Sequence, residues 1–136
     1  MSAMTEARAI QHKRTTERQL QEFVRETALR FGWLYFHYPD AAQAVAVKSG
    51  RYDALPDKGF LDTVLVPTRP GFSIYFAECK RQNGKVTPEQ QQWIDAIEQT
   101  IGIATDYVRV CVWRPSDQDD ILVLLSGQDD ERETAS

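Results

Sequence analysis

Two short apolar runs near the middle of the chain constrain its fold more than any other feature. They span residues 60–66 (FLDTVLV) and 73–79 (SIYFAEC), and the connection between them, 67–71, contains two prolines and a glycine. Residues of these types suit a tight turn, so the two runs predict a β-hairpin. Because both runs are apolar on both faces, the two strands should be central in a sheet.

Helical patterns flank the predicted hairpin. One helix, about 16–31, opens with the capping-box sequence TERQ and carries apolar residues at helical spacing as far as Gly32. A second opens with TPEQ at 87–90 and stops at Gly102. The aromatic run 33–38 and the apolar run 107–113 predict two more strands. The run 120–125 predicts a short last element, whose type the pattern alone does not fix and which we expect to be a short helix. We therefore expect an α/β fold, a mixed sheet of about four strands flanked by helices in α-β-β-β-α-β order.

The length of the chain, 136 residues, suits a single domain. We expect this domain to span 15–127. The segment 1–14 lacks apolar periodicity and is expected to be a ragged, flexible N-terminus, and 128–136 an acidic, flexible tail. The segment 40–59 mixes small residues with glycine, proline and basic residues and has no clean period, so it is the natural candidate for a substrate loop.

Composition indicates a soluble protein, with 42% hydrophobic and 26% charged residues. No apolar run approaches the ~20 residues of a membrane-spanning helix, and the start of the chain lacks the apolar centre of a signal peptide. Cys79 and Cys111 lie in apolar runs without the spacing of a metal site, which favours reduced, buried thiols. We therefore expect a cytoplasmic protein without a membrane partner.

Taken alone, the formal net charge of −4 argues against a nucleic-acid partner, because duplex binding depends on neutralising phosphates. The charge is unevenly distributed. Seven of the 20 acidic residues follow Ser116, against one basic residue there, which leaves 15 basic and 13 acidic residues in 1–116. The mild excess of basic residues in 1–116 permits a DNA substrate that is held by local contacts, but charge alone does not predict such a substrate.

Charged residues stand in both central strands, where the pattern asks for apolar ones. Asp62 interrupts the first run, while Glu78 and Lys80 end the second and, being two apart, project from one face. A hairpin that brings Asp62 beside Glu78 would join two carboxylates and one ammonium. Two close carboxylates favour a cation such as Mg²⁺ between them. The alternative is a salt bridge of Lys80 with one carboxylate, at the end of the sheet and outside any active site.

Several short motifs follow one another over about 15–120. They are Thr16-Glu17, Gly32-Trp33 with Tyr35-Phe36-His37, Gly59-Phe60-Leu61-Asp62, Ala77-Glu78-Cys79-Lys80, Gly84-Lys85-Val86-Thr87-Pro88-Glu89-Gln90 with Trp93, and Val112-Trp113-Arg114-Pro115 with Asp117. In this order and spacing they resemble the VRR-NUC family of the PD-(D/E)XK nuclease superfamily. Leu61 and Thr63 depart from the family, which usually has proline before the aspartate and a large aliphatic residue after it.

The resemblance implies a metal-dependent nuclease. It implies that Asp62 and Glu78 hold the metal, that Lys80 serves the attacking water, and that Gln90 is an auxiliary active-site residue. In the expected mechanism Mg²⁺ or Mn²⁺, also held by the backbone carbonyl of Cys79, polarises the phosphate and lowers the pKa of a bound water. Glu17 matches an acidic residue of the first helix that can approach the metals in related junction-cutting nucleases.

Several of these candidates have a plainer interpretation that stays open. Gln90 also sits where a capping-box glutamine belongs, and Glu17 suits the dipole of a helix start. His37 suits a satisfied, partly buried histidine, and Arg114 with Asp117 suits a simple turn. Five basic residues flank the predicted site and are candidates for phosphate contacts, although solvated loop charges are the alternative: Lys48, Arg51, Lys58, Arg81 and Lys85.

The expected function is therefore a divalent-metal-dependent DNA endonuclease. Compact relatives resemble Holliday-junction resolvases, which cut branched DNA as two-fold dimers, so we expect branched DNA as the substrate and a homodimer. An alternative of another class is a catalytically silent nuclease fold kept as a DNA-binding or assembly module. A restriction-type enzyme is a third possibility, but so short a chain offers no separate recognition element.

Overall fold

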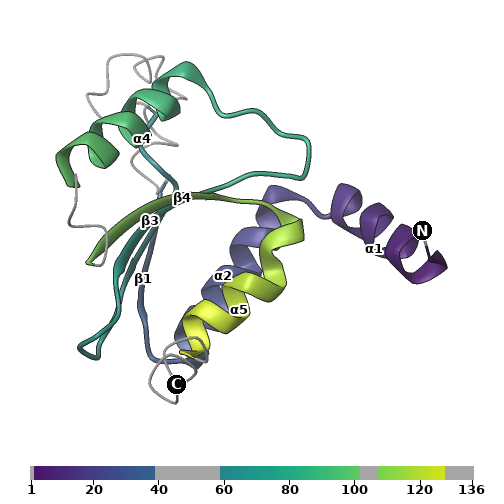
Figure 1. Ribbon diagram of the computed structural model, residues 1–136, viewed down its shortest axis with the longest axis horizontal. Helices are drawn as coiled ribbons and strands as arrows, with labels where there is room; N and C mark the ends of the chain where they lie inside the picture. The colour runs from purple at the N-terminus through teal and green to yellow at the C-terminus, as the bar shows by residue number, and fades with distance from the viewer. Residues whose placement is uncertain (1, 39–58, 102–106, 128–136) are drawn as a thin grey trace, which may run out of the picture.

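The computed structural model describes residues 2–38, 59–101 and 107–127 (Figure 1). Its elements follow in the order α1 (Ala3–Arg14), α2 (Glu17–Arg30), β1 (Leu34–His37), β2 (Thr63–Val66), β3 (Ile74–Cys79), α4 (Pro88–Ile101), β4 (Val108–Trp113), the 3-10 helix η2 (Pro115–Asp117) and α5 (Gln118–Ser126). The expected α/β class is confirmed. No helix in these described ranges is long and apolar enough to cross a membrane.

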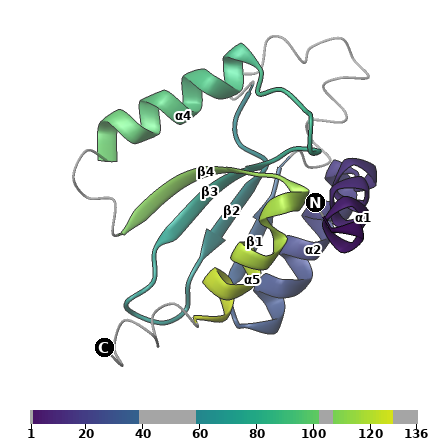
Figure 2. The same cartoon turned by 45° about the vertical axis from the view of Figure 1, so that its right-hand side comes forward.

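The four strands form one mixed, open sheet in the order β1-β2-β3-β4. β2 pairs antiparallel with β1 and with β3, so the predicted hairpin is confirmed and its two strands are the central ones. β3 and β4 are parallel, which requires a crossover, and α4 lies in that connection. Helix α4 covers one face of the sheet, while α2 and α5 lie side by side on the other (Figure 2).

The main core lies between the sheet and the layer formed by α2 and α5. Helix α2 contributes Leu20, Val24 and Ala28, which are fully buried and follow one another at intervals of four, so they share one face. The sheet contributes Leu65 and Ala77, which are also fully buried. At about 1.5–3 kcal/mol for each large apolar side chain removed from water, this layer supplies much of the stability of the domain.

The last element is helix α5, which confirms the expected short helix. Its residues Ile121 and Leu125 are buried, and the backbone oxygen of Leu125 accepts a 2.9 Å hydrogen bond from the indole Nε1 of Trp33. The helix ends at Gly127, whose φ of 81° is the left-handed conformation that commonly terminates helices. The start of β1 and the end of α5 are thereby joined.

Two expectations about local structure differ from the observed fold. Residues 1–14 were expected to be irregular, yet Ala3–Arg14 form α1, in which Ser2 Oγ accepts a 3.2 Å bond from the backbone N–H of Thr5. A cap and good helix formers favour this helix without an apolar stripe, and no residue of α1 is buried. The first strand of the hairpin begins at Thr63 rather than at 60. The carboxylate of Asp62 accepts the hydrogen bond from the backbone N–H of Cys79, so the backbone hydrogen bonds between β2 and β3 do not continue past this point.

Candidate active site

Asp62, Glu78 and Lys80 lie together at one end of the two central strands. Asp62 directly precedes β2, Glu78 belongs to β3, and Lys80 follows β3. All three are buried, with exposed fractions of 7%, 4% and 8%. The backbone N–H of Asp62 donates a 3.0 Å hydrogen bond to Glu78 Oε2, so the expected juxtaposition of the two carboxylates is confirmed.

Each of the two carboxylates accepts a hydrogen bond from a backbone N–H at or next to the residue that carries the other carboxylate. Glu78 accepts from the N–H of Asp62, and both oxygens of Asp62 lie 3.1 Å from the N–H of Cys79, the residue after Glu78. The hydroxyl of Thr63 adds a 2.9 Å bond to Asp62 Oδ1. Because these donors belong to the sheet or its immediate ends, the hairpin itself fixes the separation of the two carboxylates.

Two glutamine amides reach the carboxylates from helices on opposite faces of the sheet. Gln21 of α2 donates through Nε2 to Asp62 Oδ2 at 3.0 Å, and Gln90 of α4 donates through Nε2 to Glu78 Oε1 at 2.7 Å. The Oε1 of Gln90 accepts from the N–H of Thr87 at 2.9 Å, which fixes the orientation of the amide. Gln90 therefore caps α4, as the capping-box interpretation predicts, and its amide also contacts Glu78.

Gly59 explains how α4 comes close enough for this contact. Its φ is 82°, and a Cβ built there would lie 2.7 Å from the backbone carbon of Glu89 and 3.0 Å from the nitrogen of Gln90. Only glycine tolerates both the conformation and the approach. The ring of Phe60 packs edge-on against Trp93 with 4.9 Å between centroids. The segment that leads to Asp62 is thus packed directly against the first turns of α4.

The electrostatics of the site favour a positive partner. Burial raises the pKa of Asp62 from 3.8 to about 6; bonds from Thr63, Cys79 and Gln21 oppose the rise, and the charge of Glu17 adds to it. Burial, followed by the negative charge of Asp62, raises the pKa of Glu78 from 4.5 to about 7, opposed by the Asp62 N–H and by Lys80. Two buried carboxylates therefore resist ionising together.

Lys80 compensates only part of this charge. Its Nζ lies 3.5 Å from Glu78 Oε1, so the salt bridge of the simpler interpretation exists. One ammonium beside two ionised carboxylates still leaves one negative charge. Among the described residues, no group of three or more His, Cys, Asp or Glu side chains could hold a metal ion. Two carboxylates nevertheless fit Mg²⁺, which is usually bound by one or two carboxylates and keeps several waters.

Glu17 and His37 lie on the elements that adjoin the site. Glu17 is in the first turn of α2, which suits the helix dipole, and its charge also acts on Asp62. His37 pairs with Thr63 across the β1–β2 ladder and stacks on Tyr35, with 6.4 Å between ring centroids. It is partly buried as expected, but its buried Nδ1 has no hydrogen-bond partner in the described part of the chain, so the expectation of a satisfied histidine is wrong for that atom.

Arg114 holds the segment that follows Lys80. Its Nη1 donates to the backbone oxygens of Arg81, Gln82 and Gly84 at 3.0, 3.3 and 2.7 Å. Its own N–H donates to Asp117 Oδ2 at 2.8 Å, so the expected turn is present. The motif signals the turn, whereas the contact of Arg114 with a loop about 30 residues away has no local signal in the sequence.

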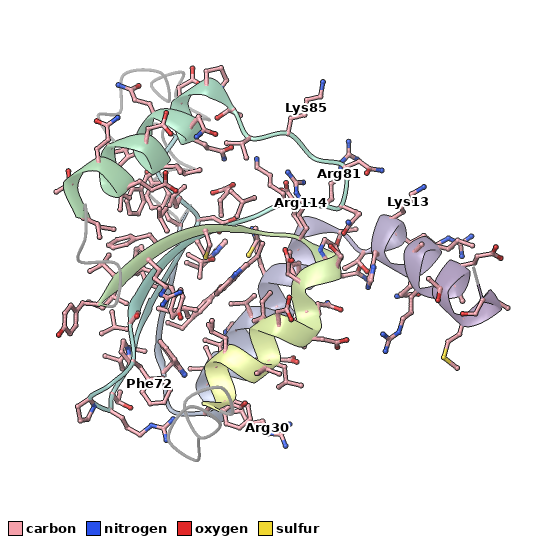
Figure 3. The ribbon with its side chains drawn as sticks, in the orientation of Figure 1. Lys13, Arg30, Phe72, Arg81, Lys85 and Arg114 are labelled. Atoms are coloured by element: carbon pink, nitrogen blue, oxygen red, sulfur yellow. The ribbon has the colours of Figure 1, made fainter. Side chains whose placement is uncertain are left out.

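Part of the expected basic surface can be located. Arg81 and Lys85 lie along the exposed loop between β3 and α4, and Lys13, at the end of α1, points to the same side of the molecule (Figure 3). Lys13 was not a candidate, because 1–14 showed no pattern. The candidates Lys48, Arg51 and Lys58, with the expected substrate loop up to residue 58, lie outside the described residues.

The two cysteines are free thiols, as the sequence predicts. Cys79 is buried and Cys111 half-buried. Burial raises the pKa of Cys79 well above its ordinary value of 9.0 and that of Cys111 to about 12. Both stay protonated at neutral pH, so neither supplies a thiolate to the site.

Comparison with known proteins gives no match, whether with protein-family models, with curated proteins or with solved structures. The resemblance to VRR-NUC nucleases therefore rests on the motifs of the sequence.

Proposed function

We propose that the protein is a divalent-metal-dependent endonuclease with a PD-(D/E)XK core, which hydrolyses phosphodiester bonds in DNA. The observation that carries the proposal is the pair of buried carboxylates, Asp62 and Glu78, beside which the described residues place one ammonium, that of Lys80. A purely structural ion pair would need one carboxylate. A second buried carboxylate costs free energy of folding unless it is protonated or a further positive charge binds there.

The residues that would hold Mg²⁺ or Mn²⁺ are Asp62, Glu78 and the backbone carbonyl of Cys79, with Glu17 a candidate for a second ion. The bound cation would polarise the scissile phosphate and lower the pKa of a water. Gln90 acts through Glu78, since its amide donates to Glu78 Oε1 and is itself held by Thr87.

Lys80 is the proposed catalytic side chain for the water. In the reaction a water oxygen bonds to phosphorus, the bond from phosphorus to the leaving oxygen breaks, and the leaving oxygen takes up a proton. Lys80 orients the water or, in its neutral amine form, takes up the proton that the water loses; in its ammonium form it offsets the charge that builds on the phosphate. Its position 3.5 Å from Glu78 keeps the ammonium at the carboxylate pair rather than in solvent.

The proposed substrate is branched DNA, cut by a homodimer in the cytoplasm. Arg81, Lys85 and Lys13 project on one side of the domain and are candidates for phosphate contacts (Figure 3). Free cysteine thiols are consistent with a reducing compartment.

The proposal is tested by incubating purified protein with labelled linear, flap, nicked and four-way-junction DNA, with and without Mn²⁺. We expect cleavage only with the metal, and none by Asp62→Asn, which also controls for contaminating nucleases. Undiminished cleavage in excess chelator would contradict the mechanism. Binding of DNA without cleavage under every metal condition would favour a silent binding module instead.

A further inference from the structure

Gln21 contacts the site although no motif of the sequence includes it. Its Nε2 donates a 3.0 Å hydrogen bond to Asp62 Oδ2, from a residue 41 positions away in the chain. It lies in α2 one turn after Glu17, so the two side chains project from the same face of the helix. The expected signs of an active-site residue, a charge or an unusual residue type, are absent here.

The backbone of Gln21 is held rigidly. Its neighbour Leu20 and the next apolar residue on that face, Val24, are both fully buried in the core. The start of α2 is fixed by the reciprocal capping box of Thr16 and Gln19, whose two bonds measure 3.1 and 2.9 Å. A side chain on so fixed a turn can hold its partner in one orientation.

The amide of Gln21 serves no other structural purpose among the described residues. Gln90 uses its oxygen to cap α4, but no hydrogen bond from the described part of the chain reaches the oxygen of Gln21. Among the described residues, the other donors to Asp62 are Thr63 and Cys79, which both belong to the sheet. Gln21 is thus the contact that orients Asp62 from the helix side.

We infer that Gln21 is a positioning residue, which acts through Asp62 and sets the affinity of the site for a divalent cation. This inference rests on the proposed function, because it presupposes that Asp62 binds the cation. A hydrogen-bond donor on a ligating carboxylate fixes the rotation of that carboxylate. Its oxygens then already face the cation, and the side chain loses less conformational entropy when the cation binds. Loss of such outer contacts typically weakens metal affinity by about 10- to 100-fold.

The test compares Gln21→Met with wild-type protein by titration calorimetry with Mn²⁺ at constant pH. Methionine has a similar length and good helix propensity but no donor. We expect the Kd for Mn²⁺ to rise by about 10- to 100-fold. The Mn²⁺ concentration that gives half-maximal cleavage should rise in parallel, and the rate at saturating Mn²⁺ should recover to near the wild-type value. Gln91→Met is the matched control, because the side chain of Gln91 donates a 2.8 Å hydrogen bond to Asp95 within α4. In this variant the Kd for Mn²⁺ and the Mn²⁺ concentration for half-maximal cleavage should both stay unchanged.

Gln21→Asn guards against misfolding of the first variant, since it keeps the amide but is too short to reach Asp62, and its Kd should rise as well. One result would overturn this inference and leave the proposed function standing. In that result wild-type protein binds Mn²⁺ and Asp62→Asn does not, but the Kd values of Gln21→Met and Gln21→Asn stay within twofold of the wild-type value. A reduced rate that saturating Mn²⁺ does not restore also overturns it, because Gln21 would then act on the substrate. Absence of Mn²⁺ binding by wild-type protein overturns the proposed function and, with it, the role of Gln21.

Discussion

At the scale of single residues, the site is built from carboxylates that each depend on the other. The backbone N–H of Asp62 donates to the carboxylate of Glu78, and the backbone N–H of Cys79, the residue after Glu78, donates to the carboxylate of Asp62. Neither side chain can therefore move without disturbing the other. Their proximity in a buried place makes the doubly ionised state unfavourable without a cation. Stability and the proposed metal binding should therefore be linked through the same two side chains.

Without a cation, the free energy of unfolding should fall as the pH rises. The folded pKa values of Asp62 and Glu78, about 6 and about 7, lie above the ordinary values of 3.8 and 4.5, so the folded state holds protons that the unfolded chain releases. The stabilisation is complete below about pH 4 and is lost as the pH rises through about 6 to 7. In chelator, thermal unfolding should give a lower Tm at about pH 8 than at about pH 5.

Two controls assign this pH dependence to the site. The double variant Asp62→Asn with Glu78→Gln should lose most of the difference in Tm, and a difference that persists in it would come from other groups. Mg²⁺ or Mn²⁺ should raise the Tm of wild-type protein at the higher pH, because a ligand that binds only the folded state stabilises it. The same ions should have little effect on the double variant.

Replacement of Lys80 separates catalysis from binding. In Lys80→Ala the rate of cleavage should fall by about 10²- to 10⁴-fold, while the Kd values for Mn²⁺ and DNA change little, because the proposed role belongs to the transition state. Single-turnover cleavage and a binding titration measure the two effects. Arg30→Ala, at the far end of α2, is the control and should keep the wild-type rate (Figure 3). A wild-type rate in Lys80→Ala would reduce Lys80 to a salt-bridge partner.

At the scale of elements, the site depends on helices that approach the sheet from both faces. Helix α2 is held by its buried stripe, which brings Gln21 to Asp62, whereas α4 is brought to Glu78 by a close contact with the chain at Gly59. Of the residues of α4, only Ile94 is buried. Within the described residues, α4 is thus held by few buried side chains, and a change at Gly59 should act mainly on Gln90.

Gly59→Ala should displace α4 from the site. Its Cβ would meet the backbone of Glu89 as well as adopt a strained φ, so we expect a loss of about 1–3 kcal/mol in the free energy of unfolding and a lower rate of cleavage. Denaturant unfolding and the cleavage assay measure these effects. Gly71→Ala is a matched control, because Gly71 has a φ of 91° but nothing within 4 Å of its Cβ position. It should show the backbone strain alone, with an unchanged rate. Equal rates in the two variants would mean that the contact at Gly59 does not position the site.

At the scale of the whole molecule, charge limits how the protein can hold DNA. The chain carries a net charge of −4, and residues 1–116 have 15 basic against 13 acidic groups. So small an excess cannot hold long duplexes tightly through phosphate contacts alone. Useful affinity would have to come from the shape of the substrate or from two subunits that bind at once.

We therefore expect a two-fold dimer that prefers four-way junctions to linear duplex of the same length. The preference should shrink as the salt concentration rises, because it depends on phosphate contacts from both subunits. Light scattering, together with a binding titration of junction against duplex DNA, tests both points. A monomer at micromolar concentration that cuts flaps or linear ends as fast as junctions would exclude the resolvase-like role and leave the nuclease proposal intact.

The sequence by itself determined the elements whose signals are local. Thr16 and Thr87 marked the starts of α2 and α4 because capping involves residues three apart, and both capping boxes are present. The hairpin followed from its turn residues and from two apolar runs. The proximity of Asp62 to Glu78 could be predicted because buried charges conflict with an apolar pattern and a hairpin allows few registers.

Only the tertiary structure decided the contacts between residues far apart in the chain. Gln21 reaches Asp62 across 41 positions, and Arg114 reaches the loop at Gly84 across 30, and neither leaves a periodic trace in the sequence. The start of β2 also depended on tertiary structure, because the side chain of Asp62 takes the N–H of Cys79 in place of a backbone oxygen. Such contacts depend on how helices pack against the sheet, and that packing is a property of surfaces brought together by folding, which no local pattern encodes.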